Sequence, residues 1–264
     1  MQQSSENPIG IFDSGIGGTS IWKEIHQLLP TENTIYLSDS INAPYGQKSI
    51  DRIIELSVKN TEFLLDKNCK LIVVACNTAT TNAINYLRTN YDVPFIGIEP
   101  AIKPASIQTK TNTIGILATK GTLNSKLFES TSNTLDRHVQ IVEQVGEGLV
   151  ELIENGLLHS EKMTTLLTKY LHKLMRHNID HLVLGCTHYP YLIPQIKKIT
   201  NNKITIIDSG LAVAKQTKRI LERHQLININ HTSLVNQFYI NTKTNVLKQV
   251  IEKDDSIKID YLDF

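Results

Sequence analysis

The chain has 264 residues, with 27 Lys and Arg against 26 Asp and Glu, so its formal net charge is +1. This balance argues against a protein that binds nucleic acid or an anionic membrane through bulk basic charge. A hydrophobic fraction of 41% and a charged fraction of 20% are typical of a folded globular protein. No apolar run reaches the roughly 18 residues of a membrane span, and the polar start at 1–7 does not resemble a secretion signal. We expect a cytoplasmic protein.

Short apolar runs alternate with longer amphipathic segments along the chain, which predicts strands alternating with helices. Strands are expected at 9–12, 34–37, 71–75, 95–98, 113–117, 139–142, 181–184 and 204–207, and late strands at 237–240 and 257–261. Helices are expected at 19–29, 50–66, 78–88, 163–177, 210–223 and 245–252. Such alternation is typical of βαβ units, so the predicted fold class is α/β with mostly parallel, doubly wound sheets.

The chain also repeats itself. IGIFDS at 9–14 resembles IGILAT at 114–119, and LIVVACN at 71–77 resembles HLVLGCT at 181–187, with the two cysteines 110 residues apart. GIEP at 97–100 corresponds to IIDS at 206–209. Nearly equal spacing in the same order predicts two similar α/β domains that face each other, with the active site in the cleft between them.

The repeat also sets the expected domain boundaries. The second domain should span 99–211 and carry Cys186 and His188, while the first should span 1–98 and carry Asp13 and Cys76. The tail at about 212–264 has no counterpart in the repeat, so we expect it to pack back on the first domain.

In doubly wound sheets, ligands bind at the carboxyl ends of the strands. The predicted strands end in polar residues there: Asp13 and Ser14; Cys76, Asn77 and Thr78; Thr119; and Cys186, Thr187 and His188. Cys76 and Cys186 both fall where a strand passes into a helix, and a helix N-terminus favours a thiolate, so a lowered pKa is expected for both. Cys69 precedes its strand and is expected to be structural or incidental.

Three cysteines are too few and too scattered for a disulfide framework, and their spacing suggests no metal site, so reduced thiols are expected. The turn at 15–18 is neither a dinucleotide-binding motif nor a P-loop, although its backbone N–H groups are suited to binding a carboxylate. Tyr45 and Gly46 lie in a turn where the Tyr45 ring and hydroxyl are placed to close a pocket. A plain loop is equally compatible with that spacing.

Two thiols that face each other from similar halves suit a reaction with mirror-image demands. Inverting a stereocentre needs a base on one face and an acid on the other, and a thiolate with a thiol supplies both. His188 is placed to assist Cys186, and Asp13 stands in the same relation to Cys76 if their strands are adjacent. Asn77, Thr78 and Thr187 are suited to holding a substrate carboxylate.

These motifs resemble those of the cofactor-independent glutamate racemases of the aspartate/glutamate racemase superfamily. The resemblance rests on IGIFDSGIGGTS at 9–20, APYGQK at 43–48, VVACNTAT at 73–80, PFIGIEP at 94–100, IGILATKGT at 114–122 and LVLGCTHYPYL at 182–192. It implies interconversion of L- and D-glutamate, which supplies D-glutamate for peptidoglycan. It also implies no cofactor, no metal, and a homodimer.

The resemblance further implies residue roles. Cys76 and Cys186 would be the two acid/bases, supported by Asp13, His188 and Glu154. Substrate contacts would come from Asp13, Ser14, Tyr45, Gly46, Asn77, Thr78, Thr119, Thr122, Thr187 and His188. The segment at 144–148 departs from the family, many members of which have small residues and a proline there, and this bears on the placement of Glu154.

Three other functions stay open on the residues alone. The chain is compatible with a racemase of aspartate or of another acid, with a hydrolase or transferase that uses one cysteine as nucleophile, and with a small-acid binding protein. A single-nucleophile enzyme leaves the second strand-end cysteine unexplained. A pyridoxal-dependent racemase is disfavoured because no lysine stands at a strand end to form a Schiff base.

Overall fold

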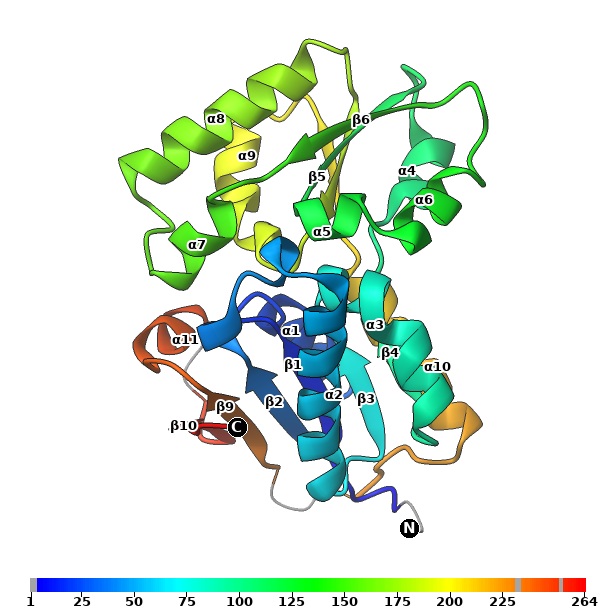
Figure 1. Cartoon of the computed structure of the whole chain (residues 1–264), viewed down its shortest axis with the longest axis vertical. Coiled ribbons are helices and arrows are strands. Elements are labelled where there is room, and N and C mark those ends of the chain that lie inside the picture. Colours follow the sequence, from blue (N-terminus) through cyan, green and yellow to red (C-terminus); the bar gives the residue numbers. More distant parts are fainter. Residues whose placement is uncertain (1–3, 231–233, 252–253) are drawn as a thin grey trace.

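The computed structural model describes residues 4–230, 234–251 and 254–264, which form two parallel sheets covered by helices (Figure 1). The first sheet has the order β10-β9-β2-β1-β3-β4, and every neighbouring pair is parallel. Its strands are β1 (Ile9–Asp13), β2 (Thr34–Ser38), β3 (Leu71–Val74), β4 (Phe95–Gly97), β9 (Asn236–Ile240) and β10 (Ile257–Tyr261).

The second sheet is also fully parallel and has the order β6-β5-β7-β8. Its strands are β5 (Thr113–Ala118), β6 (Gln140–Val145), β7 (His181–Gly185) and β8 (Thr205–Ile207). The central strands β1, β3, β5 and β7 are buried along their whole length, as expected for parallel strands covered on both faces.

The two sheets confirm the α/β class and the internal repeat predicted from the sequence. The order β2-β1-β3-β4 in the first sheet matches β6-β5-β7-β8 in the second, strand for strand. The strands that precede Cys76 and Cys186, β3 and β7, therefore hold equivalent places, each beside the first strand of its half.

The long helices agree closely with the predicted ones because each is long enough for its apolar residues to recur at helical spacing. They are α1 (Thr19–Leu28), α2 (Ile50–Asp66), α3 (Asn77–Asn90), α8 (Glu161–Met175) and α10 (Gly210–Arg223). Ser49 and Ser160 cap α2 and α8 by accepting hydrogen bonds from Arg52 N and Met163 N.

Several short helices were not predicted, because one or two turns carry too little periodicity to be recognised. They are α4 (Ile102–Gln108), α5 (Lys120–Leu123), α6 (Lys126–Ser132), α7 (Leu149–Glu154) and α9 (Ile193–Ile199), with 3-10 turns η1 (Ser40–Asn42), η2 (Tyr45–Gln47) and η3 (Tyr189–Leu192). The helix predicted at 245–252 is α11 (Asn245–Val250), and its expected end at Glu252 lies outside the described residues.

The tail lies with the first sheet. Strand β9 pairs with β2 and carries β10 on its outer side, while α10 packs along α1 (Figure 1). The boundaries at 98/99 and 211/212 stay a prediction. Across the described ranges, no helix is both long and apolar enough to cross a membrane.

Candidate active site

Two cysteines occupy equivalent places at the carboxyl ends of β3 and β7. Cys76 is the N-cap of α3, and its Sγ accepts a hydrogen bond from Ala79 N at 3.4 Å. Its thiol donates to Ser14 Oγ at 3.7 Å. Cys186 Sγ lies 3.7 Å from Nδ1 of His188. Both side chains are buried, so the fold encloses two thiols at matching positions of its two halves.

Both thiols line one small cavity between the halves. The volume accessible to water is about 10 Å³, which is room for roughly one water molecule. The cavity is lined by Ser14, Pro44, Tyr45, Gly46, Cys76, Asn77, Thr78, Thr119, Val150, Cys186, Thr187 and His188. Residues from both sheets thus converge on a single, closed site.

The predicted low pKa is wrong for Cys76. Burial raises the pKa of its thiol well above the usual value, and the nearby Asp13 raises it further. The hydrogen bonds from Ala79 N and to Ser14 oppose this rise without overcoming it. The free energy needed to remove a thiolate from water exceeds the stabilisation that one helix N-terminus supplies, so Cys76 is a neutral thiol in this closed site.

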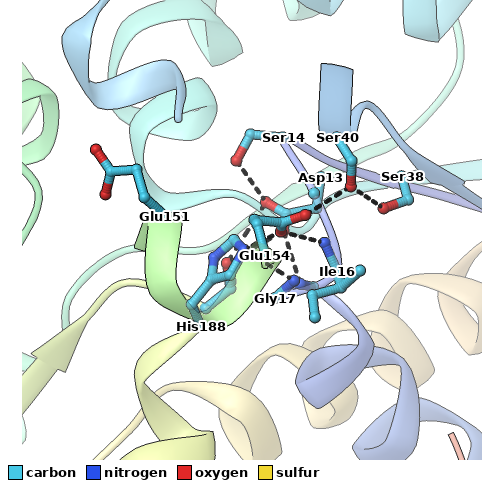
Figure 2. A network of polar contacts seen from close by, with 12 residues as sticks. Asp13, Ser14, Ile16, Gly17, Ser38, Ser40, Glu151, Glu154 and His188 are labelled. Carbon is cyan, nitrogen blue, oxygen red and sulfur yellow. Dashed lines mark hydrogen bonds and ion pairs between the residues drawn. The ribbon is translucent and has the colours of Figure 1, made fainter. Parts of the chain in front are cut away.

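His188 is held as a cation by its partners on both sides. Burial lowers the pKa of the imidazole, but contacts with Cys186 and Glu154 raise it, and the net result is a pKa well above the usual value. Nε2 lies 2.5 Å from Glu154 Oε1 (Figure 2). The imidazolium therefore places a positive charge beside the sulfur of Cys186.

Glu154, at the end of α7, joins the second half of the chain to the first. Its Oε1 accepts a hydrogen bond from Ile16 N at 2.7 Å, and its Oε2 accepts one from Ser40 Oγ at 2.7 Å. Figure 2 shows these bonds meeting the His188 contact at one carboxylate. The carboxylate that orients His188 thus also fastens the two halves together.

The glycine-rich turn after β1 approaches this network closely. A Cβ atom at Gly15 would overlap the Glu154 carboxylate, and one at Gly17 would overlap the His188 ring. Gly17 N also lies 3.2 Å from His188 Nε2. The turn therefore needs glycine for close approach to the opposite half, rather than for a positive φ.

Asp13 lies behind the cavity at the end of β1, and it is fully buried. Its Oδ2 accepts a hydrogen bond from Gly18 N at 2.7 Å, and Thr187 Oγ1 lies 3.4 Å from both carboxylate oxygens. Burial raises the pKa of Asp13 to about 6, although the positive charge of His188 lowers it. Strands β1 and β3 are adjacent, but the Cys76 thiol bonds to Ser14 rather than to Asp13.

Asn77 is poised to bind a ligand. In the parts of the chain that the structure describes, its buried Oδ1 and Nδ2 have no hydrogen-bond partner. Because a buried amide without partners is costly, its place on the cavity wall indicates that a ligand completes its bonding. Beside it, Thr78 Oγ1 lies 2.8 Å from Thr119 Oγ1 and 3.3 Å from Thr122 Oγ1, a hydroxyl cluster that bridges the halves.

Tyr45 closes the cavity on the side of η2. Its hydroxyl donates to Asp39 Oδ2 at 2.5 Å and accepts from Asn60 Nδ2 at 3.1 Å. Burial and the Asp39 carboxylate hold the pKa of Tyr45 well above its usual value. Gly46 approaches Thr119 so closely that a Cβ there would overlap the threonine.

The structure brings the sequence-predicted residues together in two layers. Ser14, Tyr45, Gly46, Cys76, Asn77, Thr78, Thr119, Cys186, Thr187 and His188 line the cavity, while Asp13, Thr122 and Glu154 stand behind them. Sequence reasoning did not assign Pro44 and Val150, which lie on the cavity wall, or Ser40, which binds Glu154. Pro44 stands in the APYGQK segment, whereas Val150 and Ser40 have no motif around them. Cys69 lies apart, with a pKa raised to about 12 by burial.

Comparisons with known proteins agree with this architecture. The family model of Asp/Glu/hydantoin racemases matches residues 9–217. The chain is 44% identical over 223 residues to a glutamate racemase from Herpetosiphon aurantiacus, covering 84% of this chain and 88% of that protein. The chain therefore belongs to the Asp/Glu/hydantoin racemase family, and the resemblance to glutamate racemases predicted from its motifs is confirmed.

Solved structures lead to the same group of enzymes, the amino-acid racemases. Glutamate racemase from Escherichia coli, solved with L-glutamate and an activator, superposes with a TM-score of 0.85 at 31% identity, over 97% of this chain and 98% of that one. The enzyme from Francisella tularensis, solved with D-glutamate, gives a TM-score of 0.84 at 28% identity, over 98% of both chains.

Proposed function

We propose that the protein interconverts L- and D-glutamate without a cofactor, using Cys76 and Cys186 as acid and base on opposite faces of the α-carbon. The observation that carries this proposal is that two thiols from equivalent strand ends line the same cavity. Relatives solved with L-glutamate and with D-glutamate support the choice of substrate.

On one face, Cys186 acts as the base. The His188 imidazolium at 3.7 Å from its sulfur stabilises the thiolate, which takes the α-proton of L-glutamate and becomes a thiol. The electron pair of the broken C–H bond stays on the α-carbon. Glu154 keeps His188 charged during this step because its Oε1 accepts a hydrogen bond from the protonated Nε2, 2.5 Å away.

On the other face, Cys76 acts as the acid. Its raised pKa keeps the sulfur protonated in the closed site, so a proton is ready for delivery to the opposite face of the carbanion. Delivery of this proton forms D-glutamate and converts Cys76 into a thiolate, which accepts hydrogen bonds from Ala79 N and the Ser14 hydroxyl. The reverse reaction exchanges the roles of the two cysteines.

The substrate carboxylates and ammonium are held by the polar wall between the thiols. The free amide of Asn77, the hydroxyls of Thr78 and Thr187 and the backbone at Gly46 are the groups suited to this binding. A cavity of about 10 Å³ does not hold glutamate, so the halves separate to admit it. Closure around the substrate then removes water and strengthens each polar contact.

The test is α-proton exchange in deuterated water, followed by NMR from each pure enantiomer. Cys76→Ser and Cys186→Ser keep the shape of the site but raise the pKa of the acid/base group, so racemisation should fall by about 10²-fold or more. Cys76→Ser should retain residual exchange only into L-glutamate, and Cys186→Ser only into D-glutamate.

Cys69→Ala is the matched control, because Cys69 is a buried thiol outside the cavity. It should racemise glutamate like the wild type. Equal residual exchange of both enantiomers in both serine variants would mean that one base serves both faces, and would overturn the two-cysteine mechanism. Activity should also persist after chelation of metals and treatment with carbonyl reagents, and a loss restored by a metal would contradict the proposal.

The biological setting follows from the family resemblance. We propose that the enzyme works in the cytoplasm, supplies D-glutamate for peptidoglycan synthesis, and acts as a homodimer. The cellular role is tested by depletion, which should halt wall synthesis unless D-glutamate is supplied. The assembly is tested by light scattering, in which a monomer at working concentration would exclude the dimer.

A further inference from the structure

A buried polar cluster behind Tyr45 lies outside the roles implied by the family motifs. At its centre is Asp39, which follows β2 and has no exposed surface. One of its oxygens, Oδ1, accepts hydrogen bonds from Asn42 Nδ2 at 2.9 Å and Asn241 Nδ2 at 2.6 Å. The other, Oδ2, accepts the Tyr45 hydroxyl at 2.5 Å. The two oxygens therefore hold different parts of the structure.

The Oδ1 side ties the cluster to the tail of the chain. Asn241 directly follows β9, and its own Oδ1 accepts a hydrogen bond from Ile41 N at 2.9 Å. Asn241 thus bonds both to Asp39 and to the turn η1 that leads to Tyr45. This residue lies beyond 9–217, the part matched by the family model.

The Oδ2 side reaches the cavity. Tyr45 is 1% exposed, lines the site beside Gly46, and receives its second hydrogen bond from Asn60 of α2. Because the Tyr45 hydroxyl bonds to both Asp39 and Asn60, the ring is held in one orientation, and the backbone at 45–46 is held with it. The Asp39 backbone N–H also donates to Asp13 O at 3.1 Å, so the cluster is anchored at the end of β1.

We propose that Asp39 is a positioning residue for the racemase site, which acts through Tyr45 to hold the cavity wall at 45–46 in its substrate-binding position. The proposal rests on the function proposed above. Asp39 lies outside the residues that line the cavity, and among its hydrogen-bond partners in the described chain Tyr45 alone belongs to that lining, so we assign its effect on the reaction to the tyrosine hydroxyl. Binding of substrate, rather than proton transfer, is the step it serves.

Asp39→Asn tests this role with little change of shape. The remaining carbonyl oxygen can still accept from Asn42, from Asn241 and from Lys59 Nζ, which lies 3.5 Å from Oδ1, while the amide nitrogen replaces the oxygen that accepts from Tyr45. We expect KM for glutamate to rise about 10-fold, the size of one charge-assisted hydrogen bond, with little change in kcat. Tyr45→Phe should have a similar effect.

The double variant Asp39→Asn/Tyr45→Phe separates positioning from a general loss of stability. If Asp39 acts through Tyr45, the asparagine should add less than about a 2-fold change in KM once the hydroxyl is gone. Asp180→Asn is the control, because Asp180 also accepts several hydrogen bonds, from Thr109 Oγ1, Lys110 N and Thr111 N, but precedes β7 at the end of that strand opposite to Cys186. It should lower Tm and leave KM unchanged.

The outcomes distinguish this inference from the function on which it rests. A wild-type protein that does not racemise glutamate refutes the proposed function. A wild-type protein that does racemise it, together with an unchanged KM in Asp39→Asn, or with single-variant effects that multiply in the double variant, refutes the positioning role of Asp39 alone.

Discussion

Replacing Glu154 by Gln isolates the charge of the carboxylate that supports His188. The glutamine oxygen can still accept from Ile16 N and the His188 ring, and its amide can still meet Ser40 Oγ, so the shape of the network is kept. What is lost is charge assistance, which makes a hydrogen bond roughly twice as strong as a neutral one. Losing this charge assistance should weaken the hydrogen bond to His188 by about 1.4 kcal/mol, which corresponds to about a 10-fold decrease in kcat/KM.

The same change has a predicted direction in the pH profile. The Glu154 carboxylate is one cause of the raised pKa of His188, so removing it lowers that pKa. Activity that needs the imidazolium is lost as pH rises through the His188 pKa, and this alkaline limb should therefore move to lower pH in the variant. The rates are measured from the loss of circular dichroism as pure L- or D-glutamate racemises. Because two enantiomers have equal free energy, kcat/KM should fall equally in both directions.

Glu151→Gln is the matched control for this experiment. Glu151 lies one turn earlier in α7, binds Gln47 Nε2 at 2.6 Å, and points away from the His188 network in Figure 2. It should leave the pH profile in place. A Glu154→Gln enzyme with the wild-type alkaline limb, or the same shift in both variants, would refute the role given to the Glu154 charge.

Two further predictions concern reactivity and stability. Thiol alkylation should modify Cys186 and inactivate the enzyme, because the His188 imidazolium lies 3.7 Å from its sulfur, and glutamate should protect it. Cys69 should resist, because burial raises its pKa to about 12. Peptide mapping that finds only Cys69 modified in the inactive enzyme would contradict this. Asp13→Asn should abolish activity yet stabilise the fold at about pH 8 by up to about 3 kcal/mol. Burial raises the pKa of the Asp13 carboxyl from 3.8 to about 6, so the folded protein is destabilised as pH rises through that range and the buried carboxyl ionises, and the asparagine removes this cost. The gain should vanish at about pH 3, below both values, and urea unfolding curves that show equal gains at both pH values would refute it.

The sequence predicts the strands and the site best where one local rule decides both. Cys76 and Cys186 each follow a short and mainly apolar run, so a buried strand and a residue at its carboxyl end come from the same pattern. The repeat then pairs the two ends. Glu154 differs, because a short helix places it and only the family resemblance pointed to it.

The features that were missed depend on contacts between distant parts of the chain. Nothing in the local pattern around Asn241 shows that β9 pairs with β2 and brings the amide to Asp39. The prediction of a lowered pKa for Cys76 was wrong for a related reason. A helix start is visible in the sequence, whereas the depth of burial that outweighs it is set by the closing of two sheets.

The turn at Gly15 and Gly17 shows how a site between two halves limits the residues that its sequence can carry. The heavy atoms nearest to an added methyl group belong to Glu154 at Gly15 and to His188 at Gly17, and both residues come from the opposite half. We therefore expect alanine at either position to act mainly on the contact between the halves. The side chain that these two positions can carry is thus limited by the opposite half of the site, and a larger residue there should hold the two halves apart at Glu154 and His188.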